Sequence, residues 1–123
     1  MEMPTGAGGR LPIRLAQWQL RRAQALIEAH LDQPLSIAWL ARECGLSRSH
    51  FSCAFHGSTG LSPQQWLIRA RLQRAQRLLL EGHSVAMVAC ACGFSDQAHF
   101  ARVFGRNEGV APSRWRQAQL HGA

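Results

Sequence analysis

An internal repeat limits the folds that this sequence allows. SIAWLARECGLS begins at Ser36 and SVAMVACACGFS begins at Ser84, so six identical residues recur 48 positions apart. One extra residue in the second copy then moves the offset to 49, and the match continues through two Phe, a Gly, a Pro and a Trp. The continued pairs are Phe51 and Phe100, Phe55 and Phe104, Gly60 and Gly109, Pro63 and Pro112, and Trp66 and Trp115. A solenoid needs at least about three repeats, so we expect two related units instead.

Each copy has the pattern of a helix-turn-helix. A serine suited to an N-cap precedes a short helix, and a glycine ends that helix where a left-handed conformation costs least. A second serine then precedes a helix with Phe at positions i and i+4, which places both rings on one face. The expected cap and turn residues are Ser36, Gly45 and Ser47 in the first copy, and Ser84, Gly93 and Ser95 in the second. The two motifs are predicted over about 36–57 and 84–107.

Helical patterns also flank and join the two copies. A helix is expected over about 62–81, with Ser62 as N-cap, Pro63 at its first position and Gly82 after its end. Its apolar residues cover more than one stripe, so we expect it to pack against a unit at each end and to fix their spacing. An amphipathic helix is predicted from Ile13 to about His30, with Leu15, Trp18, Ala25, Ile27 and Leu31 as its apolar residues.

A last short helix is predicted over about 112–120. Strand signals such as alternating apolar runs or Asn-Gly turns are absent, so the fold class is all-α. Residues 1–12, MEMPTGAGGRLP, are rich in Gly and Pro and are expected to be a disordered tail or linker before a domain spanning 13–120.

The charge balance indicates a polyanionic partner. The 14 basic residues are all Arg and face only seven acidic residues, which gives a formal net charge of +7. Nucleic acid is the first candidate and a membrane surface the second. The exclusive use of Arg is also compatible with a compositional habit of the source genome.

Other classes of protein are disfavoured. The apolar run from Val85 to Cys92 is far shorter than the ~18 residues of a membrane span, and the N-terminus lacks a secretory signal, so a cytosolic protein is expected. The four cysteines lack metal-site spacing and are expected to be small buried residues in a reducing compartment; no metal or cofactor is predicted. No nucleophile with a base, phosphate-binding loop or paired carboxylates is present, so we expect no enzyme. The four cysteines mentioned above are Cys44, Cys53, Cys90 and Cys92.

Two runs of the sequence are distinctive: A-R-E-C-G-L-S with F-x3-F-x4-G-L-S-P-x-x-W-L, and G-F-S-D-Q-A-H-F-A-R-V-F-x4-G-V-A-P-S-x-W-R. On these motifs the chain, from about Arg14 to Gln117, resembles the DNA-binding domain of the AraC/XylS family of bacterial transcription regulators. It implies seven helices, two helix-turn-helix subdomains and a rigid linking helix, with two recognition helices in adjacent major grooves. Trp66 and Trp115 stand where the family has Tyr or Phe, which is expected to change packing only.

The resemblance implies sequence-specific binding of double-stranded operator or promoter DNA by a regulator of transcription. Because the two recognition helices belong to one chain and differ in sequence, we expect a monomer on DNA. Activation is the expected direction, with RNA polymerase as a further partner and no membrane association. The alternative is a basic helical module that binds a protein without specific DNA readout. Because an effector-binding domain usually precedes this domain in the family, we expect either a stand-alone regulator or the C-terminal part of a longer one.

The candidate DNA contacts lie on the two recognition helices, opposite the core Phe residues or in the first turn, and His99 adjoins a core Phe. In the first recognition helix they are Arg48, Ser49, Ser52, Cys53 and His56, and in the second they are Gln97, Ala98, His99 and Arg102. Arg102 is predicted to read guanine, since its guanidinium matches the O6 and N7 acceptors, and Gln97 to contact adenine. Arg48 is predicted to contact phosphate, and His99 to have a structural or phosphate role. Ser62 and Ser113, at helix starts, are further candidates for phosphate contact.

Overall fold

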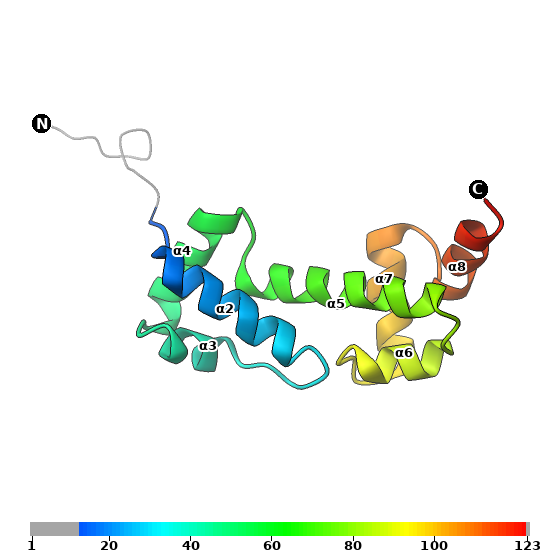
Figure 1. The fold of residues 1–123 in the computed structure, drawn as a ribbon, viewed down its shortest axis with the longest axis horizontal. Coiled ribbons are helices and arrows are strands. Elements are labelled where there is room, and N and C mark those ends of the chain that lie inside the picture. The colour runs from blue at the N-terminus through cyan, green and yellow to red at the C-terminus, as the bar shows by residue number, and fades with distance from the viewer. Residues whose placement is uncertain (1–12, 123) are drawn as a thin grey trace, which may run out of the picture. The chain divides into compact units, whose positions relative to one another are not determined.

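The computed structural model describes residues 13–122, and this part of the chain forms seven α-helices without a strand. The helices are α2 (Gln17–Ala29), α3 (Ile37–Glu43), α4 (Arg48–Thr59), α5 (Pro63–Leu80), α6 (Val85–Ala91), α7 (Gln97–Glu108) and α8 (Pro112–Leu120), coloured along the chain in Figure 1. The predicted all-α fold is confirmed. The tail expected over residues 1–12 lies outside the described residues.

The chain divides into two compact units, which we describe separately. Among the described residues, the first unit holds 13–26 together with 36–65, and the second holds 27–35 together with 66–122. The first contains the pair α3 and α4, and the second contains the pair α6 and α7, followed by α8. Each unit therefore carries one of the two repeated motifs.

Side-chain caps begin most of the short helices, as the sequence predicts. The hydroxyl groups of Ser36, Ser47 and Ser84 each accept a hydrogen bond from the amide three residues later, at 3.1–3.2 Å. Ser95 was expected to cap the second recognition helix, and this prediction is wrong. The carboxylate of Asp96 caps α7 instead, because the extra residue of the second copy lengthens the turn by one position and leaves Asp96 next to the helix.

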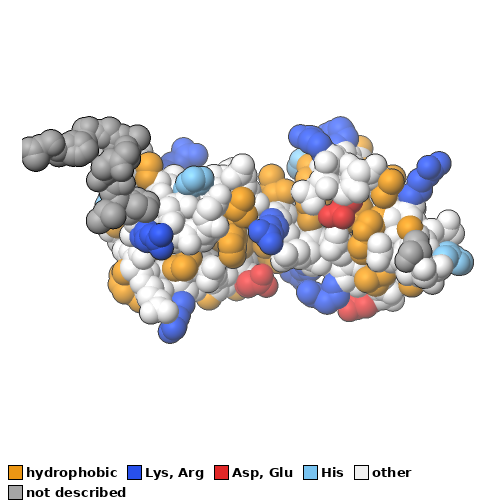
Figure 2. Space-filling model, turned by 90° about the horizontal axis from the view of Figure 1, so that it is seen from above, with side chains coloured by type: hydrophobic (Ala, Val, Ile, Leu, Met, Phe, Trp, Pro, Cys, Tyr) orange, Lys and Arg blue, Asp and Glu red, His pale blue; other side chains and the backbone are white. Residues whose placement is uncertain are grey.

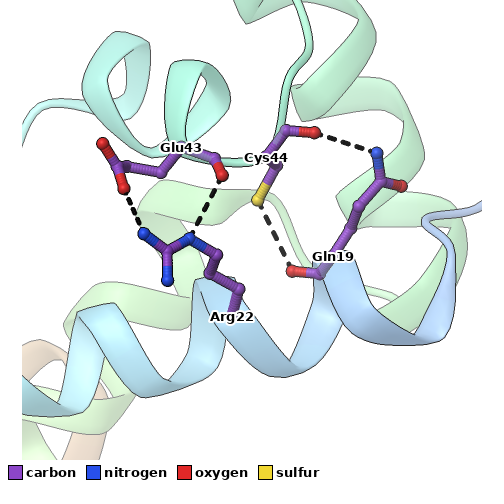
Figure 3. A network of polar contacts seen from close by, with 4 residues as sticks. All are labelled: Gln19, Arg22, Glu43 and Cys44. Carbon is purple, nitrogen blue, oxygen red and sulfur yellow. Dashed lines mark hydrogen bonds and ion pairs between the residues drawn. The ribbon is translucent and has the colours of Figure 1, made fainter.

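A network of polar contacts joins α2 to the end of α3 in the first unit (Figure 3). The side-chain amide of Gln19 donates to the carbonyl oxygen of Cys44 at 3.0 Å, and the Cys44 thiol donates back to the Gln19 carbonyl at 3.5 Å. Arg22 donates to the Glu43 carbonyl and forms an ion pair with the Glu43 carboxylate. These contacts satisfy carbonyl groups at the end of α3 that the helix itself leaves unpaired.

The buried face of α2 differs from the predicted face. Ala23 and Ile27 are fully buried, whereas Trp18 is 58% exposed and Ala25 is also exposed. The helix begins at Gln17 rather than at Ile13, and Trp18 stands five residues before Ala23, about 140° around the helix from it. Trp18 therefore lies outside the buried stripe.

A row of aromatic rings forms the core of the second unit. Phe94 packs on Phe100 with ring centres 5.0 Å apart, Phe100 on Phe104 at 5.5 Å, and Phe104 on Trp115 at 5.6 Å. The surrounding buried residues are Leu72, Ala75, Leu79, Val88, Ala89 and Cys92. Trp115 thereby packs α8 against α7.

Two turn glycines in equivalent positions differ in what surrounds them. Gly45 and Gly93 both have positive φ, +73° and +82°. A Cβ at Gly45 would meet no atom within 4 Å, whereas one at Gly93 would lie 2.2 Å from the Leu31 carbonyl oxygen. That carbonyl also accepts a hydrogen bond from the Arg71 guanidinium at 3.1 Å, so it is held in place against the turn.

Gly93→Ala is therefore expected to destabilise the protein more than Gly45→Ala. At Gly45 the cost is that of a left-handed alanine, about 1–2 kcal/mol. At Gly93 the clash with backbone adds about 1–3 kcal/mol to the same cost. Urea unfolding followed by circular dichroism measures both losses, and equal losses would show that the contact between Gly93 and Leu31 is not tight.

Candidate nucleic-acid interface

The first recognition helix, α4, is anchored by its aromatic face and leaves the opposite face in solvent. Phe51, Ala54 and Phe55 have no exposed surface, and the two rings lie 5.6 Å apart. Four of the five predicted contact residues on α4 are exposed, and Ser52 is half-buried. The exposed residues are Arg48, Ser49, Cys53 and His56. The structure thus gathers Ser49, Ser52, Cys53 and His56 on one face, because residues three, four and seven apart share a helix face, whereas Arg48 is exposed at the start of the helix.

The second recognition helix, α7, repeats this arrangement. Phe100 and Phe104 are fully buried, and the residues opposite them face solvent. Ala98 and Arg102 are exposed on that face, Ala101 is half-buried, and Gln97 is exposed at the start of the helix. The long donor side chains of α7 near this face are therefore Gln97, Arg102 and the exposed Arg106.

His99 is held in place by its neighbours in the turn. Its ring packs edge-on against Phe94, with centres 5.6 Å apart, and its Nδ1 lies 3.2 Å from the hydroxyl of Ser95. Ser95, released from capping by Asp96, thus orients the histidine. This geometry fits the predicted structural role of His99 and leaves Nε2 as the atom with no partner among residues 13–122.

The arginines of the two recognition helices are free to bind a partner. Within residues 13–122, Arg48, Arg102 and Arg106 form no ion pair with an acidic side chain, and all three are exposed. Arg106 was not singled out from the sequence, although its place four residues after Arg102 puts it on nearly the same side of α7. Figure 2 shows the arginine side chains spread over the face drawn, with fewer acidic ones among them.

The two predicted phosphate sites at helix starts differ in their hydrogen bonds. Ser62 is half-buried and accepts from the Gln65 amide at 3.1 Å, while the Gln65 side chain accepts from the Ser62 amide at 2.9 Å. This reciprocal pair is a capping box. Ser113 is exposed at the start of α8, where no side chain caps the helix. The amides of α8 are thus the more accessible of the two sets.

The cysteines fall into two classes, so the expectation that all are buried is wrong. Cys44 and Cys92 are buried, whereas Cys53 and Cys90 are exposed, because they lie on helix faces turned away from the cores. Burial raises the pKa of the Cys44 and Cys92 thiols, which keeps both protonated. Within residues 13–122 no three His, Cys, Asp or Glu side chains come together as a metal site.

Comparison with known proteins places this arrangement among transcription regulators. Residues 40–118 match the sequence profile of a helix-turn-helix domain family. The chain is 37% identical over 90 residues to the probable transcriptional regulator LumQ of Photobacterium leiognathi. These aligned residues make up 72% of this chain and 36% of LumQ. The chain thus spans about a third of the length of such curated relatives.

Solved structures share the fold. A transcriptional regulator from Chromobacterium violaceum, described as having an AraC-type DNA-binding domain, superposes with a TM-score of 0.78 at 30% identity, covering 87% of this chain and 96% of that one. The DNA-binding domain of the global transcriptional factor AdpA, solved in complex with a target DNA, superposes with a TM-score of 0.75 at 36% identity. The match covers 81% of this chain and 91% of the AdpA chain. No helix within residues 13–122 has the length and apolar character to cross a membrane.

Proposed function

The chain belongs to the AraC-type helix-turn-helix family of DNA-binding transcription regulators, and we propose that it binds double-stranded DNA sequence-specifically through α4 and α7. The observation that carries this proposal is the duplicated geometry. In each unit a buried Phe pair seats one helix of 12 residues so that its opposite face is exposed, without ion pairs among the described residues. A helix presented in this way fits the width of the major groove.

The two helices are proposed to contribute differently to recognition. α7 presents Arg102, whose guanidinium can pair with both acceptors of guanine, and Gln97, whose amide can pair with adenine. α4 presents the short side chains of Ser49, Ser52 and Cys53, which discriminate poorly between bases. We therefore assign most base selectivity to α7, and we assign Arg48 and the start of α8 at Ser113 to phosphate contact.

The mode of action follows from the duplication. Because both recognition helices belong to one chain and differ in sequence, the proposed DNA-bound form is a monomer on an asymmetric site. Regulation of transcription by activation, with RNA polymerase as the protein partner, is the proposed role of the protein. We propose binding and no catalysis, in a chain that works inside the bacterial cell.

A mobility-shift experiment tests DNA binding against the alternative of a protein-interaction module. The preferred duplex is first selected from a random-sequence pool, and affinity for it is then measured at graded salt concentrations. With about five to seven phosphates neutralised, the slope of log affinity against log salt is expected near −4.5 to −6. A slope near −1, or failure to enrich any sequence, would favour the protein-interaction module.

Arg102→Ala is expected to relax base preference at one position of the selected site, because a good bidentate contact discriminates by about 1–3 kcal/mol. Arg48→Ala is the matched control, since loss of a phosphate contact weakens binding to all sequences about equally. Both variants are measured against a set of single-base changes in the selected duplex. If Arg102→Ala left selectivity intact while Cys53→Ser removed it, α4 would be the helix that reads the bases.

A further inference from the structure

The segment before α2 crosses the last turns of α4 in unusually close contact. A Cβ at Gly57 would lie 1.9 Å from the carbonyl oxygen of Ile13 and 3.0 Å from its carbonyl carbon. Gly57 has an ordinary helical conformation, so the glycine is not needed for the backbone of α4. It is needed because the backbone of Ile13 occupies the space that any larger residue would fill.

Two further contacts fasten the same segment. The amide of Leu15 donates a hydrogen bond to the hydroxyl of Ser58 at 2.9 Å, although the two residues are 43 positions apart. The Leu15 side chain is only 8% exposed. The amide of Ala16 donates to the side chain of Gln19 at 2.8 Å, which fixes the start of α2. Residues 13–16 thus form a strap that is tied to α4 at one end and to α2 at the other.

The second unit shows what α4 would look like without the strap. The repeat offset of 49 aligns Gly57 with Arg106 and Ser58 with Asn107, and both of these residues of α7 are exposed. The segment that contacts α4 at these positions therefore has no counterpart on α7 within residues 13–122. At these two aligned positions α4 carries the small residues Gly57 and Ser58, whereas α7 carries the larger Arg106 and Asn107. The small residues therefore occur in the helix that the segment 13–16 contacts.

The strap lies beside the proposed DNA-reading face. Gly57 follows Cys53 by four residues, so the two positions are separated by only about 40° around α4. Ser58 lies on the side away from that face. A segment tied at both positions can hold the last turns of α4 against rotation without covering Ser49 or Ser52, which lie earlier in the helix.

We propose that residues 13–16 position the first recognition helix for DNA, with Gly57 and Ser58 as the two positioning residues on α4. This inference rests on the proposed role of α4 in DNA binding. Release of the strap loosens the contact of α4 with DNA and leaves that of α7 unchanged.

Limited trypsin digestion of the full chain, without DNA, tests the strap itself. The bond after Arg14 contains the Leu15 amide that Ser58 holds, so its cleavage requires release of the strap. Gly57→Ala is expected to speed this cleavage at least about tenfold. Ser58→Ala, which removes the acceptor of a largely buried amide, is expected to speed it by roughly tenfold. Ser58→Thr keeps the hydroxyl and should restore slow cleavage, and Asn107→Ala, the matching change in α7, should leave it at the wild-type rate.

Hydroxyl-radical footprinting on the selected duplex then tests positioning. Gly57→Ala and Ser58→Ala are expected to lose protection over one half of the site and to retain it over the other, with about tenfold weaker binding. The proposal is overturned if the variants release the strap but keep the wild-type footprint, if protection falls equally over both halves, or if wild-type Arg14 is cleaved as fast as in the variants. Should Gly57→Ala fail to fold, the comparison of Ser58→Ala with Ser58→Thr tests the proposal by itself. If wild type binds no duplex, the proposed function fails, whereas the digestion still judges the strap.

Discussion

Burial of one pair of phenylalanines in each unit is the interaction on which the rest of the structure depends. Phe51 and Phe55 in α4, and Phe100 and Phe104 in α7, have no exposed surface. Replacing one buried Phe by Ala typically costs about 3–5 kcal/mol, which is a large part of the 5–15 kcal/mol that stabilises a small domain. Because four residues separate the rings of a pair, each helix can bury only that face and must expose the opposite one.

The two units then diverge through small changes around this shared anchor. In the second unit one additional residue lets Asp96 take over the helix cap and frees Ser95 to orient His99. In the first unit Gly57 makes room for the backbone of Ile13, where the second unit carries an exposed arginine. The same motif thus supports one helix rich in long donors and another that is braced by a segment from outside the motif.

Local patterns in the sequence predict most of the fold, and long-range contacts account for what they miss. The serine caps and the Phe spacing predict the helices and their exposed faces, since each depends on residues within about one turn, and the repeat shows that this pattern occurs twice. The sequence pattern counts Trp18 among the apolar residues of a helix from Ile13, but Trp18 is 58% exposed. The helix starts later, where the side chain of Gln19 accepts a hydrogen bond from the Ala16 amide. The strap joins Leu15 to Ser58 across 43 positions, and no local periodicity indicates such a contact.

The central claim is that both recognition helices engage one duplex, and amide chemical-shift mapping of the isotope-labelled chain tests it most directly. On titration with the selected duplex, the account predicts that the amides of 48–56 in α4 and of 97–106 in α7 shift together and saturate at one chain per duplex. Shifts confined to one of the two helices, or saturation at two chains per duplex, would contradict the account.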